Sequence, residues 1–142
     1  MIDFEPTEEQ ALIVETVHQF AENEIRPIAR ESDESGSLSQ AALNGAHELG
    51  LVANGIPEEY GGGGEPSAML GCLIAEELAW GDLSSALGIL SPSLLATPVA
   101  RFGTEEQRAR ILPTLTGPKF VPGALAAVEP RFDSDVHRPQ TT

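Results

Sequence analysis

The chain has 142 residues, the length of one ordinary domain, and this length is small for an enzyme that must enclose both a large cofactor and its substrate. Hydrophobic residues make up 41% of the sequence, which is enough for a folded core and too many for a disordered chain. The formal net charge of −14 repels phosphates, so nucleic acid and anionic membrane surfaces are not expected as partners.

Two features bear on the compartment. Cys72 is the only cysteine, which excludes an intrachain disulfide, and its apolar helical surroundings predict a buried structural thiol. The amino terminus has no basic region followed by an apolar run, and no stretch reaches the roughly 18 apolar residues that span a bilayer. We therefore expect a cytoplasmic protein without a membrane partner.

The segment 7–30 has apolar residues three or four positions apart, which predicts a long amphipathic helix. Thr7 and Gln10 have the spacing of a capping box at its start. Pro27 should bend this helix or end its regular hydrogen bonding, because proline has no backbone N–H. We expect residues 31–37 to form a polar loop.

A second, short helix is predicted after Ser39, a good cap residue, and Gly50 is expected to end it in a left-handed conformation. Four consecutive glycines, Gly61–Gly64, follow an irregular stretch. They lack the preceding strand and the Lys-Ser/Thr pair of a phosphate-binding loop, so a plain flexible loop is the favoured interpretation.

The segment 67–80 is apolar nearly all round except for two adjacent glutamates, which predicts a helix in the centre of a bundle. Asp82 is a plausible cap for a further helix over residues 83–101. Pro92 and Pro98 must distort that helix, since each removes a backbone donor.

A second capping-box pattern, Thr104 with Gln107, predicts a last helix that ends near Leu115. Beyond it, the small and apolar run at residues 123–128 suits a buried strand. The predicted fold is therefore mainly α: a helical bundle with a short β segment near the carboxy terminus. A single strand has nothing to pair with, so polypeptide that would cover it is expected elsewhere.

No self-contained chemistry emerges from the polar residues. His18, His47 and His137 share no metal-ligand spacing with one another or with a cysteine or acid, so no metal site is predicted. Glu76 and Glu77 point about 100° apart on a helix and cannot act together on one substrate atom. We predict no catalytic residue in this chain.

Several phrases, in matching order and spacing, together resemble the acyl-CoA dehydrogenase family. They are Leu49–Leu51 with Pro57–Gly62, Glu76–Ala79, Phe102–Arg108, and Val128–Pro130 followed by Ser134 and Asp135. The last phrase is similar to the Thr-Glu-Pro-Gly-Ala-Gly-Ser-Asp signature that opens the family's middle β-domain. Each phrase alone is weak, but the collinear set covers about the whole chain.

The resemblance implies an orthogonal amino-terminal helical bundle at residues 1–119 and only the start of a middle β-domain at residues 120–142. In the family, these two domains and a carboxy-terminal helical domain hold FAD, usually across a subunit boundary. A carboxylate of the last domain removes the α-proton of an acyl thioester while the β-hydrogen leaves as hydride to the flavin. The region that carries this base has no counterpart here, so the resemblance implies a part of an enzyme that acts only with the remaining domains or a partner subunit.

Site residues follow from the same resemblance. Leu125, Ala127, Val128 and Ser134 match positions that lie along the flavin, and Ser134 also matches a position near the thioester or CoA. The helix over residues 83–101 matches one that lines the acyl pocket, so the following leucines are expected to contact an acyl chain: Leu87, Leu90 and Leu94. The alternative that these are ordinary core leucines stays open.

The sequence departs from the family signature in ways that bear on the cofactor. Val128 replaces a threonine whose hydroxyl would bond the flavin, and Arg131, Phe132 and Asp133 replace small residues where backbone approaches the ligand. Two hypotheses result: part of an FAD-dependent acyl-CoA dehydrogenase acting on a CoA or carrier-protein thioester in a homo- or hetero-oligomer, or a non-catalytic helical module that binds a partner subunit.

Overall fold

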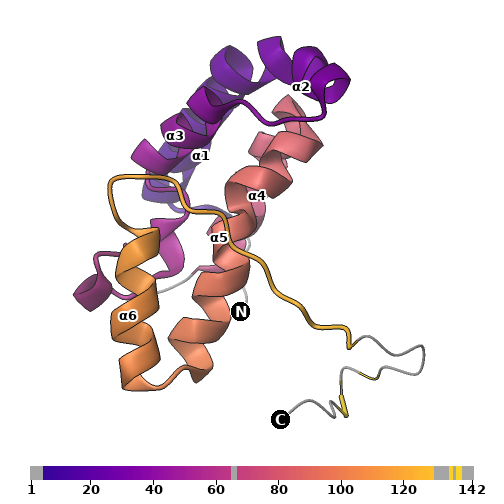
Figure 1. Ribbon diagram of the computed structural model, residues 1–142. Coiled ribbons are helices and arrows are strands. Elements are labelled where there is room, and N and C mark those ends of the chain that lie inside the picture. Colours follow the sequence, from indigo (N-terminus) through magenta and orange to yellow (C-terminus); the bar gives the residue numbers. More distant parts are fainter. Residues whose placement is uncertain (1–4, 65–66, 130–134, 136, 139–142) are drawn as a thin grey trace.

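The computed structural model describes residues 5–64, 67–129, 135 and 137–138, and most of these residues lie in helices (Figure 1). The longer helices are α1 (Glu8–Phe20), α2 (Ala29–Ser35), α3 (Gln40–Glu48), α4 (Ala68–Gly81), α5 (Leu83–Phe102) and α6 (Glu105–Leu115). Four short helical turns join them: η1 (Ala21–Ile25), η2 (Arg26–Ile28), η3 (Ala53–Gly55) and η4 (Glu58–Tyr60). The predicted mainly α class is confirmed.

The first helix begins at the predicted capping box and then changes its pitch. Thr7 Oγ1 accepts from the Gln10 amide at 3.2 Å, and the Gln10 side chain accepts from the Thr7 amide at 3.0 Å. After Phe20 the chain continues as the wide turn η1 and the tight turn η2, which contains Pro27. Proline cannot donate an i→i−4 hydrogen bond, so the regular α pattern is interrupted here, as the sequence predicts.

The predicted polar loop at residues 31–37 is wrong. The α-helix resumes as α2, and this helix is ended by Gly36. The φ of Gly36 is 65°, the left-handed conformation that stops a helix. The segment is rich in residues that tolerate a helix, and Arg30 Nε donates to Glu34 Oε1 at 2.8 Å one turn later. The polar side chains of this segment therefore belong to a solvent-exposed helix and not to a loop.

The glycine run lies in a loop between helices, as the sequence predicts, and its backbone is hydrogen-bonded there. The amides of Gly61, Gly62, Gly63 and Gly64 each donate to a backbone carbonyl of residues 53–58. A Cβ on Gly62 would collide with the backbone of Ile56, so only glycine fits there. Because all four amides are already engaged, this run has no free donors with which to cradle a phosphate.

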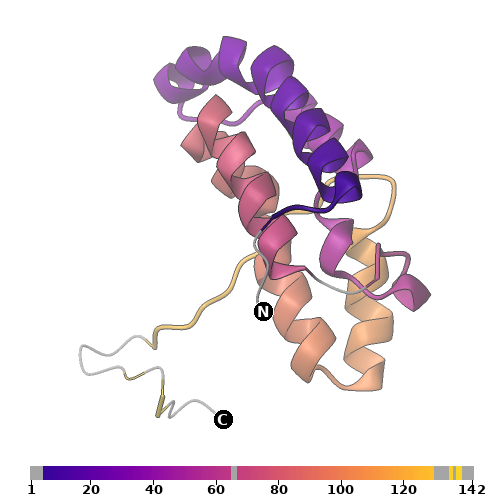
Figure 2. The same cartoon turned by 180° about the vertical axis from the view of Figure 1, so that it is seen from behind.

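The main core lies between α1, α4 and α5, with α4 packed against both of the others (Figure 2). Its fully buried side chains include Val17 of α1, Ile25 of η1, Leu78 of α4 and Ile89 of α5. The central position predicted for residues 67–80 is confirmed. The buried thiol predicted for Cys72 is wrong, because Cys72 is exposed on the face of α4 that points away from these neighbours.

Helix α5 begins at the predicted cap, with Asp82 Oδ2 accepting from the Ser85 amide at 2.6 Å, and it runs through Pro92 and Pro98 to Phe102. It is the one helix of the described chain that is long and apolar enough to cross a bilayer, although the sequence predicts no membrane-spanning segment. In this fold, α5 packs instead against α4 along one part and against α6 along another.

Helix α6 closes a second, smaller core. It starts at the predicted capping box, where Thr104 Oγ1 accepts from the Gln107 amide at 3.3 Å. Leu112 and Leu115 are buried together with Ile56 and Ala96. This cluster ties the η3–η4 region to the carboxy-terminal part of α5.

The strand predicted at residues 123–128 is wrong within the described chain, because residues 121–127 have an extended but unpaired backbone. A strand needs a neighbouring backbone to accept and donate its ladder hydrogen bonds, and the described residues provide no such neighbour. The segment passes across α5 and then leaves the helices altogether (Figure 1). The division into domains at residues 1–119 and 120–142 stays a prediction.

Candidate functional site

The three leucines predicted to contact an acyl chain lie on one side of α5 at helical spacing, but their surroundings differ. Leu87 is 67% exposed and Leu94 is 51% exposed, so neither is an ordinary core leucine. Leu90, between them, is half-buried and packs against the main core. The exposed Leu83, one turn before Leu87, extends the same apolar row toward the amino terminus of the helix.

Leu90 also lines a cavity of about 220 Å³ beneath this row. The other walls come from α4, from η3 and from α5 itself, and include Ile74, Val52 and Ser93. Leu51, Val52 and Ile74 are buried, whereas the other lining residues are partly or fully exposed, so core residues form only part of its lining. One leucine of the predicted set faces both the core and this space, while the two outer leucines face away from the described helices.

The residues predicted to lie along the flavin begin where the extended segment crosses α5. Gly123 is pressed against that helix: a Cβ built on it would lie 2.9 Å from Pro92 Cα, 2.9 Å from Leu95 Cβ and 3.0 Å from Ser91 O. This crossing point is beside the stretch of α5 that carries Leu90 and Leu94. The structure thus places Gly123, two residues before the predicted flavin segment, against the helix that carries the predicted acyl row.

Past Gly123, the segment is exposed. Leu125 is 56% exposed and Val128 is 72% exposed, and Ala127 is exposed as well. Within the described chain, the backbone of residues 124–128 makes no hydrogen bond to the helices. Ser134, with the altered residues Arg131, Phe132 and Asp133, lies outside the described residues.

Three contacts upstream of Gly123 fasten the same segment. Thr116 Oγ1 donates to the carbonyl of Tyr60 at 2.8 Å. His47 Nε2, on α3, lies 2.6 Å from the carbonyl oxygen of Gly117, and its ring meets the ring of Phe120 edge-on with centroids 6.4 Å apart. Sequence reasoning missed His47, because a partner 70 residues away leaves no local signal.

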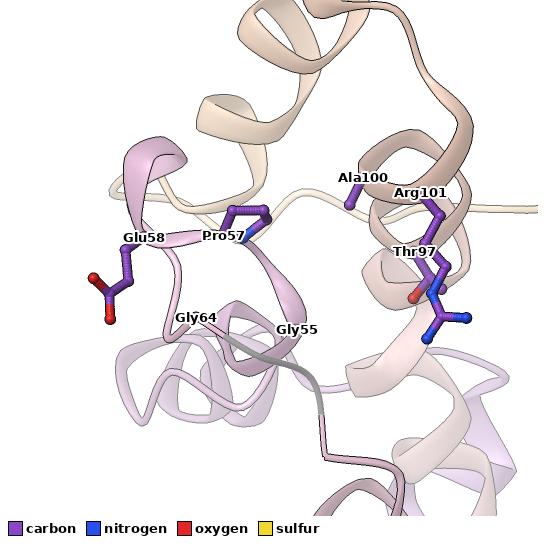
Figure 3. A pocket seen from close by; sticks show the side chains of 7 residues that line it. All are labelled: Gly55, Pro57, Glu58, Gly64, Thr97, Ala100 and Arg101. Atoms are coloured by element: carbon purple, nitrogen blue, oxygen red, sulfur yellow. The ribbon is translucent and has the colours of Figure 1, made fainter.

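A separate cleft of about 390 Å³ lies between the carboxy-terminal part of α5 and the η3–η4 region (Figure 3). Thr97 and Arg101 stand on the α5 side, whereas Pro57 and the side chain of Glu58 belong to the opposite wall, with the Glu58 carboxylate turned outward. This cleft was not predicted from the sequence. It is on the same helix as the leucine row but nearer its end.

The most polar cluster of the bundle is where α1 faces α4. His18 Nδ1 and Glu77 Oε2 are 2.7 Å apart, and this hydrogen bond is the main reason that the pKa of His18 is raised above 6.5. The His18 and Trp80 rings lie 4.5 Å apart, and Arg26 Cζ is 4.3 Å from the centre of the Trp80 ring. Glu77 is thus hydrogen-bonded to a neighbouring helix.

The described residues contain no group of three or more histidines, cysteines or acids placed to bind a metal ion. The fold and the site together define an α-helical domain with an exposed apolar row on one helix and an extended segment that leaves beside it. Residues 7–118 match the family model described as "Acyl-CoA dehydrogenase, N-terminal domain", and the chain therefore belongs to this family.

Individual relatives agree with this assignment. The chain is 34% identical over 140 residues to a probable medium-chain specific acyl-CoA dehydrogenase 2, mitochondrial, of Caenorhabditis briggsae, an alignment that covers 99% of this chain and 34% of that protein. Its fold matches butyryl-CoA dehydrogenase from Megasphaera elsdenii with a TM-score of 0.75 and 30% identity, over 91% of this chain and 34% of that one. It also matches an acyl-CoA dehydrogenase complexed with FAD from Bacillus anthracis with a TM-score of 0.71 and 31% identity, over 89% and 21% of the two chains.

These comparisons fix which part of the family the chain represents. It spans about a third of the length of the relative from Caenorhabditis briggsae, and the part it matches is the amino-terminal helical domain. The predicted family membership and the predicted helical-domain assignment are both confirmed. The relatives are dehydrogenases, and therefore oxidoreductases, by name, and this chain spans only their amino-terminal part.

Proposed function

We propose that this chain provides the acyl-side helical part of an FAD-dependent acyl-CoA dehydrogenase-like oxidoreductase. It acts together with middle and carboxy-terminal domains, which are supplied by the same polypeptide or by a partner subunit. The observation that carries the proposal is the close approach of Gly123 to α5. That contact starts the exposed segment 124–128 beside the exposed row of leucines.

The leucine row suits the hydrocarbon part of an acyl thioester. Leu87 and Leu94 are more than half exposed in the described helices, and covering one such side chain stabilises a complex by about 1.5–3 kcal/mol. The row has no charged member that an alkyl chain would have to desolvate. An acyl chain lying along α5 would therefore bury apolar surface that water now contacts.

The segment after Gly123 fits one role in flavin binding and not another. Within the described residues, its backbone N–H and C=O groups have no backbone partner, and Leu125 and Ala127 offer apolar surface of the kind that packs against a flat ring. Val128 has no hydroxyl, so it cannot donate the side-chain hydrogen bond that the family resemblance implies. When bound, FAD would supply the hydride acceptor, and these residues would hold its ring beside the acyl row.

Proton abstraction from the thioester requires a base that the described residues do not place near the leucine row. His18 and Glu77 belong to the cluster between α1 and α4, and Glu58 turns outward from the α5 cleft. A carboxylate in a water-poor site has a raised pKa and can accept the α-proton, and such a group would come from the remaining domains. This chain then binds and orients the substrate.

The test is to isolate the protein from its natural source through a tag on this chain, with any associated polypeptide retained. We expect flavin absorbance at about 450 nm and bleaching of that band when an acyl-CoA is added without oxygen. Replacing both Leu87 and Leu94 with glutamine should raise KM for a long acyl chain more than for a short one. A colourless preparation that does not bind added FAD and does not oxidise acyl-CoA would contradict the proposal.

One observation favours a second function, a non-catalytic helical module that binds a partner subunit. The exposed Val128 occupies the position where the resemblance implies a flavin-bonding threonine. In that case, the same isolation would yield a stable complex with a second polypeptide, without flavin. The double leucine substitution would then weaken the complex rather than change any turnover.

A further inference from the structure

The exit of segment 124–128 from the bundle is held by His47, which belongs to another part of the sequence. Gly117 offers its carbonyl oxygen to His47 Nε2 at 2.6 Å, and the Phe120 ring packs edge-on against the imidazole. We propose that His47 is a positioning residue that fixes where this segment leaves the helices. The description of the segment as flavin-contacting rests on the proposed function, whereas its attachment to His47 does not.

The strength of this attachment comes from its geometry. A contact of 2.6 Å is short for a nitrogen–oxygen hydrogen bond, and the imidazole can make it with Nε2 as the donor. The bond is partly buried. It joins His47 on α3 to Gly117, which follows α6 and lies 70 residues later in the sequence. Water competes poorly for such a bond, so its loss frees the chain that follows α6.

The attachment to His47 is one of two contacts that hold the chain after Thr116. His47 holds the chain at Gly117 and Phe120, and the contact with α5 holds it at Gly123. Leu125 follows only two residues later, so its Cα is within about 7 Å of the Cα of Gly123 even when the chain is fully extended. Holding the chain at both places therefore restricts the positions that Leu125 and the following residues can take relative to the leucine row on α5.

This restriction matters because ligand sites need narrow tolerances. Groups that hold a reacting ligand must stay within about 0.5 Å of their working positions. Without His47, the chain would be held only at Thr116, which stays bonded to Tyr60, and at Gly123, and it would place Ala127 and Val128 over a wider range. His47 thus acts on the ligand through the backbone that it holds, without touching the ligand itself.

Backbone NMR order parameters of the 142-residue chain test the attachment directly. His47→Ala should lower the order parameters of residues 119–121 and 123–125 toward about 0.6 or below, the range of flexible backbone, because the contacts at Gly117 and Phe120 are lost. His47→Gln retains an N–H donor and should restore most of the order. His137→Ala, at an exposed histidine, is the matched control and should leave these residues unchanged.

A second pair of variants tests the other fixed point. Gly123→Ala should lower the order parameters of the same residues, because its Cβ meets the backbone of Pro92 and Ser91, whereas a Cβ on Gly71 has nothing within 4 Å. Gly71→Ala is therefore its control. The proposal is overturned if His47→Ala leaves the order parameters of residues 119–125 unchanged while those of α3, α4 and α5 stay as in the parent chain.

Flavin binding by the complete assembly gives the functional readout. There, His47→Ala should raise Kd for FAD and His47→Gln should restore it, at an unchanged unfolding temperature. If the order parameters respond to His47→Ala but no form of the assembly binds flavin, the attachment stands and the proposed function fails. If flavin binds equally well to all His47 variants, His47 does not position the segment for the cofactor.

Discussion

His18 on α1 and Glu77 on α4 are joined by a hydrogen bond of 2.7 Å between Nδ1 and Oε2, at a partly exposed edge of the bundle. Trp80, one turn after Glu77, stacks at a tilt on the same imidazole. The pair therefore couples the protonation of one side chain to the contact between two helices. It also places the only tryptophan of the sequence beside the titrating group.

The first prediction concerns the pH dependence of this pair. The Glu77 hydrogen bond raises the pKa of His18, so protonated His18 stabilises the folded state below the unfolded-state value of 6.5, and this contribution is lost as pH rises through the raised folded value. Glu22 and Glu15 add smaller effects of the same sign, and burial opposes them. An NMR titration of the His18 ring should therefore give a pKa above 6.5.

Glu77→Gln is the matched variant for that titration, because it keeps the shape of the side chain and removes its charge. It should bring the midpoint down toward 6.5, and the Trp80 fluorescence should follow the same shift, since the two rings lie 4.5 Å apart. A midpoint at or below 6.5 in the parent chain would show that the pair does not form in solution.

The second prediction concerns the glycine run. Gly62→Ala should destabilise the fold by about 1–3 kcal/mol, because the new methyl group must displace the backbone of Ile56. Gly71→Ala on α4 is the control: nothing lies within 4 Å of its Cβ, and alanine should gain about 0.5–1 kcal/mol as the better helix former. Urea unfolding followed by far-UV circular dichroism measures both. Equal stabilities for the two variants would contradict the packed turn.

The third prediction separates the two kinds of apolar residue on α5. Ile89→Ala should cost about 2–5 kcal/mol, because this side chain is fully buried in the main core. Leu87→Ala, two positions earlier on an exposed face, should change stability by no more than about 0.5 kcal/mol. Thermal unfolding of the 142-residue chain distinguishes them. A large loss for Leu87→Ala would mean that a second copy or another segment covers the row in solution.

The fourth prediction tests a helix cap. Thr104→Ala removes the acceptor for the Gln107 amide and should cost about 1 kcal/mol, whereas Thr104→Ser keeps the oxygen and most of the stability. The effect should reach the second core, since α6 contributes Leu112 and Leu115 to it. Amide exchange in the first turn of α6 checks this, and unchanged exchange in Thr104→Ala would argue against the capping box.

The fifth prediction concerns Cys72. Because this thiol is exposed on α4, a disulfide reagent such as dithionitrobenzoate should modify it in the native protein without denaturant. Cys72→Ser should be close to neutral for stability, within about 0.5 kcal/mol. If modification required urea, the thiol would be protected in solution by a neighbour outside the described fold.

The sequence by itself determined the features that depend on residues three or four positions apart. The capping boxes at Thr7 and Thr104 and the left-handed stop at Gly50 follow from local geometry alone, because cap and amide lie within one helical turn. The collinear phrases also determined the family. The loop predicted at residues 31–37 from their polar side chains is wrong, because α2 continues to Ser35.

Only the tertiary structure decided which side chains face solvent and which distant residues meet. Helical periodicity cannot tell that Cys72 and Leu87 are exposed while Leu90 is half-buried, because that depends on where neighbouring helices end. The bond between His47 and Gly117 joins positions 70 residues apart, and no local pattern encodes such a pair. The run at residues 123–128 has the composition of a strand, yet a strand also requires a second backbone to complete its hydrogen bonds, and that requirement is met or unmet only in three dimensions.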